Sequence, residues 1–202
     1  MPSVTKYTWS LLLGNVAGNA SPIHAALVHV PATLYPFAFA ADIIGLAMEK
    51  FPMTALRQYA TSRGLYAFSY YATAAALVAT IPTAITGLAE YFAIDGVRNP
   101  AAQKTARWHS GLNVVASGIA LFNFLAKRKA VDFQPYRFNV LLSGVGLAGI
   151  IASLYLGGHL VYKHGVGVRR MGISPDDKLA GNPNADLKRD LALPTIGKKD
   201  EQ

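Results

Sequence analysis

The chain has 202 residues, of which 52% are hydrophobic and only 15% charged, and it contains no cysteine. A soluble domain carries about a quarter charged residues, so this composition indicates a protein that resides in lipid. The absence of cysteine excludes disulfides, thiolate metal sites, cysteine nucleophiles and cysteine-ligated iron–sulfur clusters.

The net charge of +8 is unevenly distributed. Residues 1–171 hold 14 Lys/Arg against 5 Asp/Glu, whereas residues 172–202 hold 5 against 6. The excess of positive charge in residues 1–171 lies at the edges of apolar runs, where cations meet lipid headgroups. No nucleic-acid reading motif accompanies it, so we predict contact with the lipid bilayer and no nucleic-acid partner.

The N-terminal segment, residues 1–21, contains a short apolar run at Trp9–Leu13 after Lys6. The run is shorter than the hydrophobic region of a signal peptide, and Asn15 interrupts it. We interpret the segment as interfacial or loosely ordered, with a signal peptide as the alternative.

Four apolar segments follow, each near the roughly 20 residues that a membrane-spanning helix needs. Their expected bounds are 27–48, 65–91, 108–126 and 139–161, with polar connections at 49–64, 92–107 and 127–138. A soluble bundle would show polar helix stripes, whereas these spans contain only Asp42 and Glu90 as charged residues. The pattern predicts an all-α membrane protein, an up-down four-helix transmembrane bundle over residues 22–171.

The C-terminal tail, residues 172–202, is rich in Asp, Lys, Pro, Gly and Asn. It has too little apolar surface to offset its ordering entropy, so we predict a disordered tail.

The sequence leaves the orientation in the membrane open. We call the face that bears the N-terminus side A and the opposite face side B. Seven Lys/Arg lie near the helix ends on each side, so the positive-inside rule gives no direction. Which membrane holds the protein is also left open.

All five histidines are expected on side A, together with Glu90 at the end of the second span. His24 and His29 lie around the start of the first span and His109 at the start of the third, whereas His159 and His164 lie around the end of the fourth. Asn113 and Ser117 continue a polar stripe beneath His109 at helical spacing. His24 precedes the first span and is expected to face water. Ionisable residues inside a membrane suggest function, although histidines at helix ends also bind headgroups.

Two histidines on facing helices suit a b-type haem, whereas three with a carboxylate suit zinc or non-haem iron. We therefore predict His29, His109, His159 and His164 as cofactor-binding residues, and His29, His109, His159 and Glu90 as the set for a bare metal. Gly149, Ser153 and Gly157 recur at every fourth residue of the last span. This spacing favours close helix packing over room for a porphyrin edge. Asp42 is expected to pair with Arg57, Arg63 or Lys127 of side B, in preference to a proton-relay role.

Four segments resemble the predicted membrane family catalogued as domain of unknown function 2231: HAALVHVPATLYPFAFAADIIG, TAITGLAEY, WHSGLNVVA and GGHLVYKHGVGV. The resemblance covers about residues 22–168, and Gly157–Val168 is its most specific part. It places the family's recurring histidines at His29, His109, His159 and His164, and its acidic residue at Glu90. Some bacterial members carry a Rieske iron–sulfur domain, which implies electron transfer; here a separate protein would have to supply it.

Three functions remain as hypotheses, and whether the protein is an enzyme is left open. The first is a membrane protein that binds haem b through His29, His109 and His159 and exchanges electrons with a quinone or a partner protein. Glu90, Asn113 and His164 would be supporting or substitute groups. The second is a non-enzymatic accessory or structural membrane protein. The third is a metal-dependent membrane hydrolase in which three histidines and Glu90 activate water.

Overall fold

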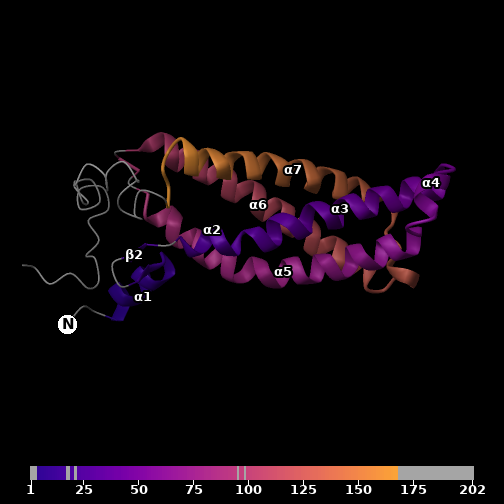
Figure 1. Ribbon diagram of the computed structural model, residues 1–202, viewed down its shortest axis with the longest axis horizontal. Coiled ribbons are helices and arrows are strands. Elements are labelled where there is room, and N and C mark those ends of the chain that lie inside the picture. Colours follow the sequence, from indigo (N-terminus) through magenta and orange to yellow (C-terminus); the bar gives the residue numbers. More distant parts are fainter. Residues whose placement is uncertain (1–3, 17–18, 21, 95, 98, 168–202) are drawn as a thin grey trace, which may run out of the picture. The chain divides into compact units, whose positions relative to one another are not determined.

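The computed structural model of the protein describes residues 4–16, 19–20, 22–94, 96–97 and 99–167. Helices make up most of this part of the chain (Figure 1). They are α1 (Val4–Leu12), α2 (Ile23–Leu27), α3 (His29–Lys50), α4 (Thr54–Arg57), α5 (Ser62–Phe92), α6 (Pro100–Lys127), the 3-10 helix η1 (Val131–Phe133) and α7 (Arg137–Tyr162). The strands β1 (Asn15–Val16) and β2 (Asn19–Ala20) form a two-residue antiparallel pair. The predicted disordered tail lies outside the described residues.

Four helical segments among the described residues are long and apolar enough to cross a membrane. They are Ile23–Lys50, which combines α2 and α3, and the helices α5, α6 and α7. Each expected span lies inside one of these segments. The all-α fold and the multi-pass membrane location predicted from the sequence are therefore confirmed.

The third long helix, α6, begins at Pro100, within the polar connection predicted over residues 92–107. Asn99 supplies the reason, because its side-chain oxygen accepts a hydrogen bond from the backbone N–H of Ala102 at 3.1 Å. Asparagine before a helix and proline at its first position are both favourable. The apolar run marks where the hydrocarbon begins, whereas the helix starts at its cap.

The chain divides into two compact units. Unit 1 comprises the described residues of Met1–Leu27, Pro82–Arg107 and Gly157–Gln202, and unit 2 comprises Val28–Ile81 and Trp108–Leu156. All four long helices contribute to unit 2, where they surround one apolar core. The buried core residues are Tyr35, Phe39, Ala76, Ala116, Ala120 and Ile150.

Side-chain contacts within unit 2 fix the direction of its helices. Tyr35 of α3 hydrogen-bonds Thr80 of α5 at 2.9 Å, whereas Asp42, further along α3, lies in a cluster with Ser69, earlier in α5. The two helices are therefore antiparallel. Asn123 of α6 bonds Ser143 of α7, and Asn113, earlier in α6, bonds Ser153, later in α7. This second antiparallel pair completes the up-down bundle.

The end of α7 belongs to unit 1 and is closed by a glycine. Gly165 has φ +67°, a left-handed conformation that glycine adopts without steric cost. Its N–H donates to the carbonyl of Val161 at 3.0 Å, and the N–H of Val166 donates to Leu160 at 2.9 Å. These bonds satisfy carbonyls that a helix end otherwise leaves without partners.

Candidate functional site

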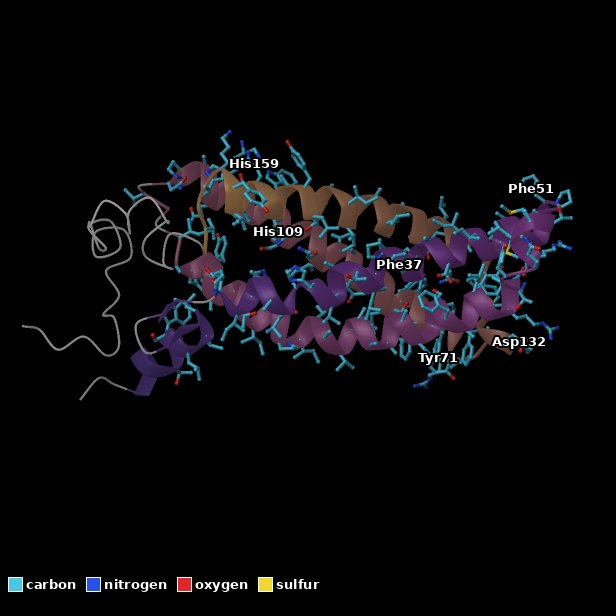
Figure 2. The ribbon with its side chains drawn as sticks, in the orientation of Figure 1. Phe37, Phe51, Tyr71, His109, Asp132 and His159 are labelled. Carbon is cyan, nitrogen blue, oxygen red and sulfur yellow. The ribbon has the colours of Figure 1, made fainter. Side chains whose placement is uncertain are left out.

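His109 is held in a polar cluster of unit 2 where α6 and α7 meet (Figure 2). Its Nδ1 lies 2.9 Å from the backbone carbonyl oxygen of Ser153 and 3.0 Å from the Ser153 Oγ. Asn113, one helical turn below, donates its amide to Ser153 Oγ at 2.7 Å and to the His109 carbonyl at 2.9 Å. The polar stripe expected beneath His109 is thus confirmed at Asn113.

The carbonyl partner determines which ring nitrogen of His109 carries the proton. A carbonyl oxygen only accepts hydrogen bonds, so Nδ1 is the donor and a neutral ring has its lone pair on Nε2. The Asn113 amide nitrogen lies 3.3 Å from Nε2, its longest contact to a polar atom in this cluster. Metal-ligating histidines commonly have this arrangement, with one nitrogen fixed by a carbonyl and the other facing the metal.

His24, a residue of α2, forms a similar arrangement in unit 1, where its ring is half-buried against α5. Its Nδ1 lies 3.0 Å from the Thr83 carbonyl oxygen and 3.4 Å from the Thr86 hydroxyl. A Cβ atom at Gly87 would approach the His24 ring to 2.8 Å, so the glycine makes room for the ring. The expectation that His24 faces water was wrong, because the ring packs against α5.

His159 and His164 also belong to unit 1 and form a pair at the end of α7. Their ring centroids are 5.6 Å apart, with the rings inclined at 67° in an edge-to-face arrangement. The backbone joins the two residues as well, because the N–H of His164 donates to the carbonyl of His159 at 3.3 Å. Both rings are half-buried, and Figure 2 shows His159 on α7.

Glu90 is a buried carboxylic acid of unit 1, with 6% of its surface exposed. It lies near Gly167, whose φ is +80° and whose Cβ, if present, would be 3.9 Å from both Glu90 carboxylate oxygens and 3.4 Å from Pro22. Those distances are ordinary van der Waals contacts, so space alone does not require a glycine there. The left-handed backbone at position 167, the last glycine of the HGVGV segment, is the physical reason for a glycine.

His29, the first residue of α3, belongs to unit 2 and is exposed. Among the described residues, no three His, Asp or Glu side chains lie close enough together to hold a metal ion. The shared site of His29, His109 and His159, with Glu90 or His164, stays a prediction.

A second polar cluster of unit 2 lies toward side B and contains a buried ion pair. The Lys127 ammonium is 2.9 Å and 3.2 Å from the two carboxylate oxygens of Asp42, and both residues are only 1% exposed. Ser69 Oγ lies 2.6 Å from the ammonium, and the Ser143 hydroxyl donates to Asp42 at 2.9 Å. The prediction that Asp42 pairs with a cation of side B is confirmed, with Lys127 as the partner.

This cluster links all four helices, since Asp42, Ser69, Lys127 and Ser143 come from α3, α5, α6 and α7. Asn123 extends it by donating to Ser143 Oγ at 2.9 Å and to the Asn139 carbonyl at 3.1 Å, and it accepts from the Asn139 amide at 2.9 Å. Asn123 and Asn139 were not predicted from the sequence as members of a cluster. A polar side chain within each of two adjoining apolar spans could have indicated them.

The close helix contact of α7 is at Gly146. A Cβ atom there would lie 2.7 Å from the Phe39 ring of α3, whereas one at Gly149 would meet nothing within 4 Å. Of the predicted small-residue series, Ser153 contacts α6 through His109 and Asn113, whereas Gly149 makes no close contact. The close packing predicted at Gly149 is therefore not found, and α7 instead approaches α3 closely at Gly146.

The family described as predicted membrane protein (DUF2231) matches residues 20–170. No curated protein and no solved structure matches the chain.

Proposed function

Because the chain belongs to the family of predicted membrane proteins catalogued as domain of unknown function 2231, we propose a function that a membrane-embedded helix bundle can perform. The protein binds a metal-containing cofactor through histidine, with haem b as the favoured cofactor, and it exchanges electrons with a quinone or a separate partner protein. Bundle interiors are where such cofactors are commonly bound.

The observation that carries this proposal is the hydrogen bonding of His109. Its Nδ1 is fixed on the Ser153 carbonyl at 2.9 Å, so Nε2 is the ring nitrogen whose lone pair could bind a metal in place of its 3.3 Å contact with the Asn113 amide. The same Nδ1-to-carbonyl bond at His24, 3.0 Å from Thr83, orients a second histidine ring in unit 1. Both histidines are positioned before any ligand binds, which lowers the ordering cost of binding.

Haem requires fewer protein ligands than a bare ion does, because one or two axial side chains hold its iron. A single well-oriented histidine is therefore a sufficient start for a haem site. When bound, the iron would supply reversible one-electron chemistry. The protein's own contribution is to orient the imidazole and to keep water away by surrounding it with helices.

The accessory-protein function is the second candidate, and the Asp42–Lys127 cluster favours it. Every charged and hydroxyl group of that cluster has a partner within unit 2, as expected for side chains that hold helices together. A protein built only for such packing would bind no cofactor.

The metal and haem content of the detergent-purified protein distinguishes these functions. We expect a Soret band in the visible spectrum that shifts when dithionite is added. A colourless protein with one zinc per chain would support the metal-dependent hydrolase instead. A colourless protein without metal, purified from cells supplied with haem precursor and iron, would contradict cofactor binding and favour the accessory function.

A further inference from the structure

The side B end of unit 2 carries an exposed, strongly basic surface. It is formed by residues 49–64, from the end of α3 to the start of α5, and by residues 128–138, from the end of α6 to the start of α7. Six exposed cations lie there: Lys50, Arg57, Arg63, Arg128, Lys129 and Arg137. Lys127 belongs to the same stretch of sequence but is buried in its pair with Asp42, so it does not contribute to this surface.

The only two acids of these connections already have partners. Asp132 lies 3.1 Å from the Arg63 guanidinium, and Glu49 accepts a hydrogen bond from the Gln134 amide at 3.2 Å. Within residues 49–64 and 128–138, all of which the structure describes, no third carboxylate exists to neutralise the rest. The surface therefore has a net excess of four positive charges, counted as six cations against two acids.

Large apolar and aromatic side chains lie among these cations. Tyr59 is 83% exposed and Tyr136 70% exposed, and Phe51, Val131 and Phe138 are exposed as well. Figure 2 shows Phe51, Tyr71 and Asp132 toward the same end of unit 2. Aromatic side chains of this kind concentrate at the membrane–water interface, where the ring meets the acyl boundary and cations reach the headgroups.

The connection between α6 and α7 is held in place by a strained backbone turn, stacked aromatic rings and an ion pair. Asp132 and Phe133 have φ values of +54° and +56°, which non-glycine residues adopt at a cost. The Phe133 ring stacks on Tyr70 with centroids 4.1 Å apart, and Tyr70 in turn stacks on Phe124 at 4.7 Å. The Arg63–Asp132 bridge joins this connection to the start of α5.

We propose that this surface, formed by Lys50, Arg57, Arg128, Lys129 and Arg137 with the exposed rings around them, binds the phosphate headgroups of anionic phospholipids. The excess positive charge selects headgroups with a net negative charge over zwitterionic ones, and the neighbouring aromatic rings place that charge at headgroup depth. The binding does not depend on the histidines or on any cofactor.

Native mass spectrometry of the full chain, released from micelles doped with phosphatidylglycerol or phosphatidylcholine, tests the proposal. We expect more bound phosphatidylglycerol than phosphatidylcholine. The variant Arg128→Gln/Lys129→Gln/Arg137→Gln should weaken phosphatidylglycerol binding by at least about tenfold. Each cation near an anionic membrane surface adds to the electrostatic attraction, and this variant removes three of them. All three positions are exposed, and the buried Lys127 stays in place.

The matched control is Lys104→Gln/Arg107→Gln/Lys163→Gln, which likewise removes three exposed cations, all of them in unit 1. It should leave phosphatidylglycerol binding within about twofold of the wild type. Equal losses in both variants, or no preference of the wild type for phosphatidylglycerol, would overturn the proposal. Gel filtration of each variant checks that a loss of binding is not a loss of folding.

Discussion

Lys127 and Asp42 are 85 residues apart in the chain, yet their side chains form an ion pair of 2.9 Å that is almost completely buried. Each ion has further partners, since Ser69 contacts the ammonium and Ser143 donates to the carboxylate. Charges removed from water are tolerated only when paired and hydrogen-bonded in this way. The pair therefore determines how α3 and α6 are aligned along their length.

Replacing Lys127 by Met should destabilise the protein strongly, because it leaves the Asp42 carboxylate buried without a cation. Removing one partner of a buried pair typically costs about 3–5 kcal/mol. The melting temperature of the detergent-solubilised protein, followed by tryptophan fluorescence, measures the effect. Lys129→Met is the matched control, since Lys129 is exposed, and it should melt near the wild type. Identical melting of both variants would show that the pair is not stabilising.

The double variant Asp42→Asn/Lys127→Met separates loss of the pair from loss of packing. It removes both charges, so no uncompensated ion stays in the core, and it should recover part of the stability lost in Lys127→Met. A double variant that is less stable than Lys127→Met would contradict this explanation.

Two glycines of unit 2 should not tolerate a methyl group. A Cβ at Gly45 would lie 2.5 Å from the Tyr66 ring, and one at Gly146 would lie 2.7 Å from the Phe39 ring. Gly45→Ala and Gly146→Ala should each cost about 1–3 kcal/mol through overpacking. Gly149→Ala is the control in the same helix, because a Cβ there meets nothing within 4 Å. Equal thermal stability of the Gly146 and Gly149 variants would contradict the predicted close contact.

His24→Ala should reduce stability by about 1 kcal/mol or more, since it removes the hydrogen bond to the Thr83 carbonyl and leaves a gap beside Gly87. His24→Gln should be less harmful if its amide can donate to the same carbonyl. Thermal melting of both variants measures the difference. An unchanged melting temperature for His24→Ala would instead agree with a ring in water.

Phe133→Ala should loosen the connection between α6 and α7, because it removes the stack on Tyr70, worth about 0.5–1.5 kcal/mol for an aromatic pair. The same residue has φ +56°, so Phe133→Gly relieves backbone strain while losing the ring. We expect Phe133→Gly to be the milder of the two changes when limited proteolysis of this connection is timed. Faster cleavage of the glycine variant would argue that the backbone there is not strained.

The helices were predictable from the sequence because lipid imposes a single strong requirement, an apolar run long enough to cross it. The same reasoning placed Asp42 near three cations, of which Lys127 is the partner. Choosing among them needs the relative register of α3 and α6, which depends on how core residues of the two helices, such as Phe39, Ala116 and Ala120, pack together. The pattern of residues along one helix does not show how that helix is positioned along its neighbour.

The histidines were harder to predict for the same reason. Depth along a helix suggested that His24 lies in water, whereas its ring fits against Gly87 on another helix. Asn113 was expected below His109 because one helical turn separates them, and that local relationship was confirmed. The partner on the opposite helix, the Ser153 carbonyl, depends on how α6 and α7 pack.

The reduced-minus-oxidised absorption spectrum of the detergent-purified protein, recorded for the wild type and for His109→Phe, tests cofactor binding by histidine most directly. Phenylalanine keeps an apolar ring in the bundle but has no nitrogen to bind iron. Cofactor binding through His109 predicts Soret and α-band differences in the wild type and their loss in His109→Phe, with Lys104→Gln unchanged as the control. A wild-type protein without these bands after haem supplementation, or a His109→Phe variant with unaltered bands, would contradict it.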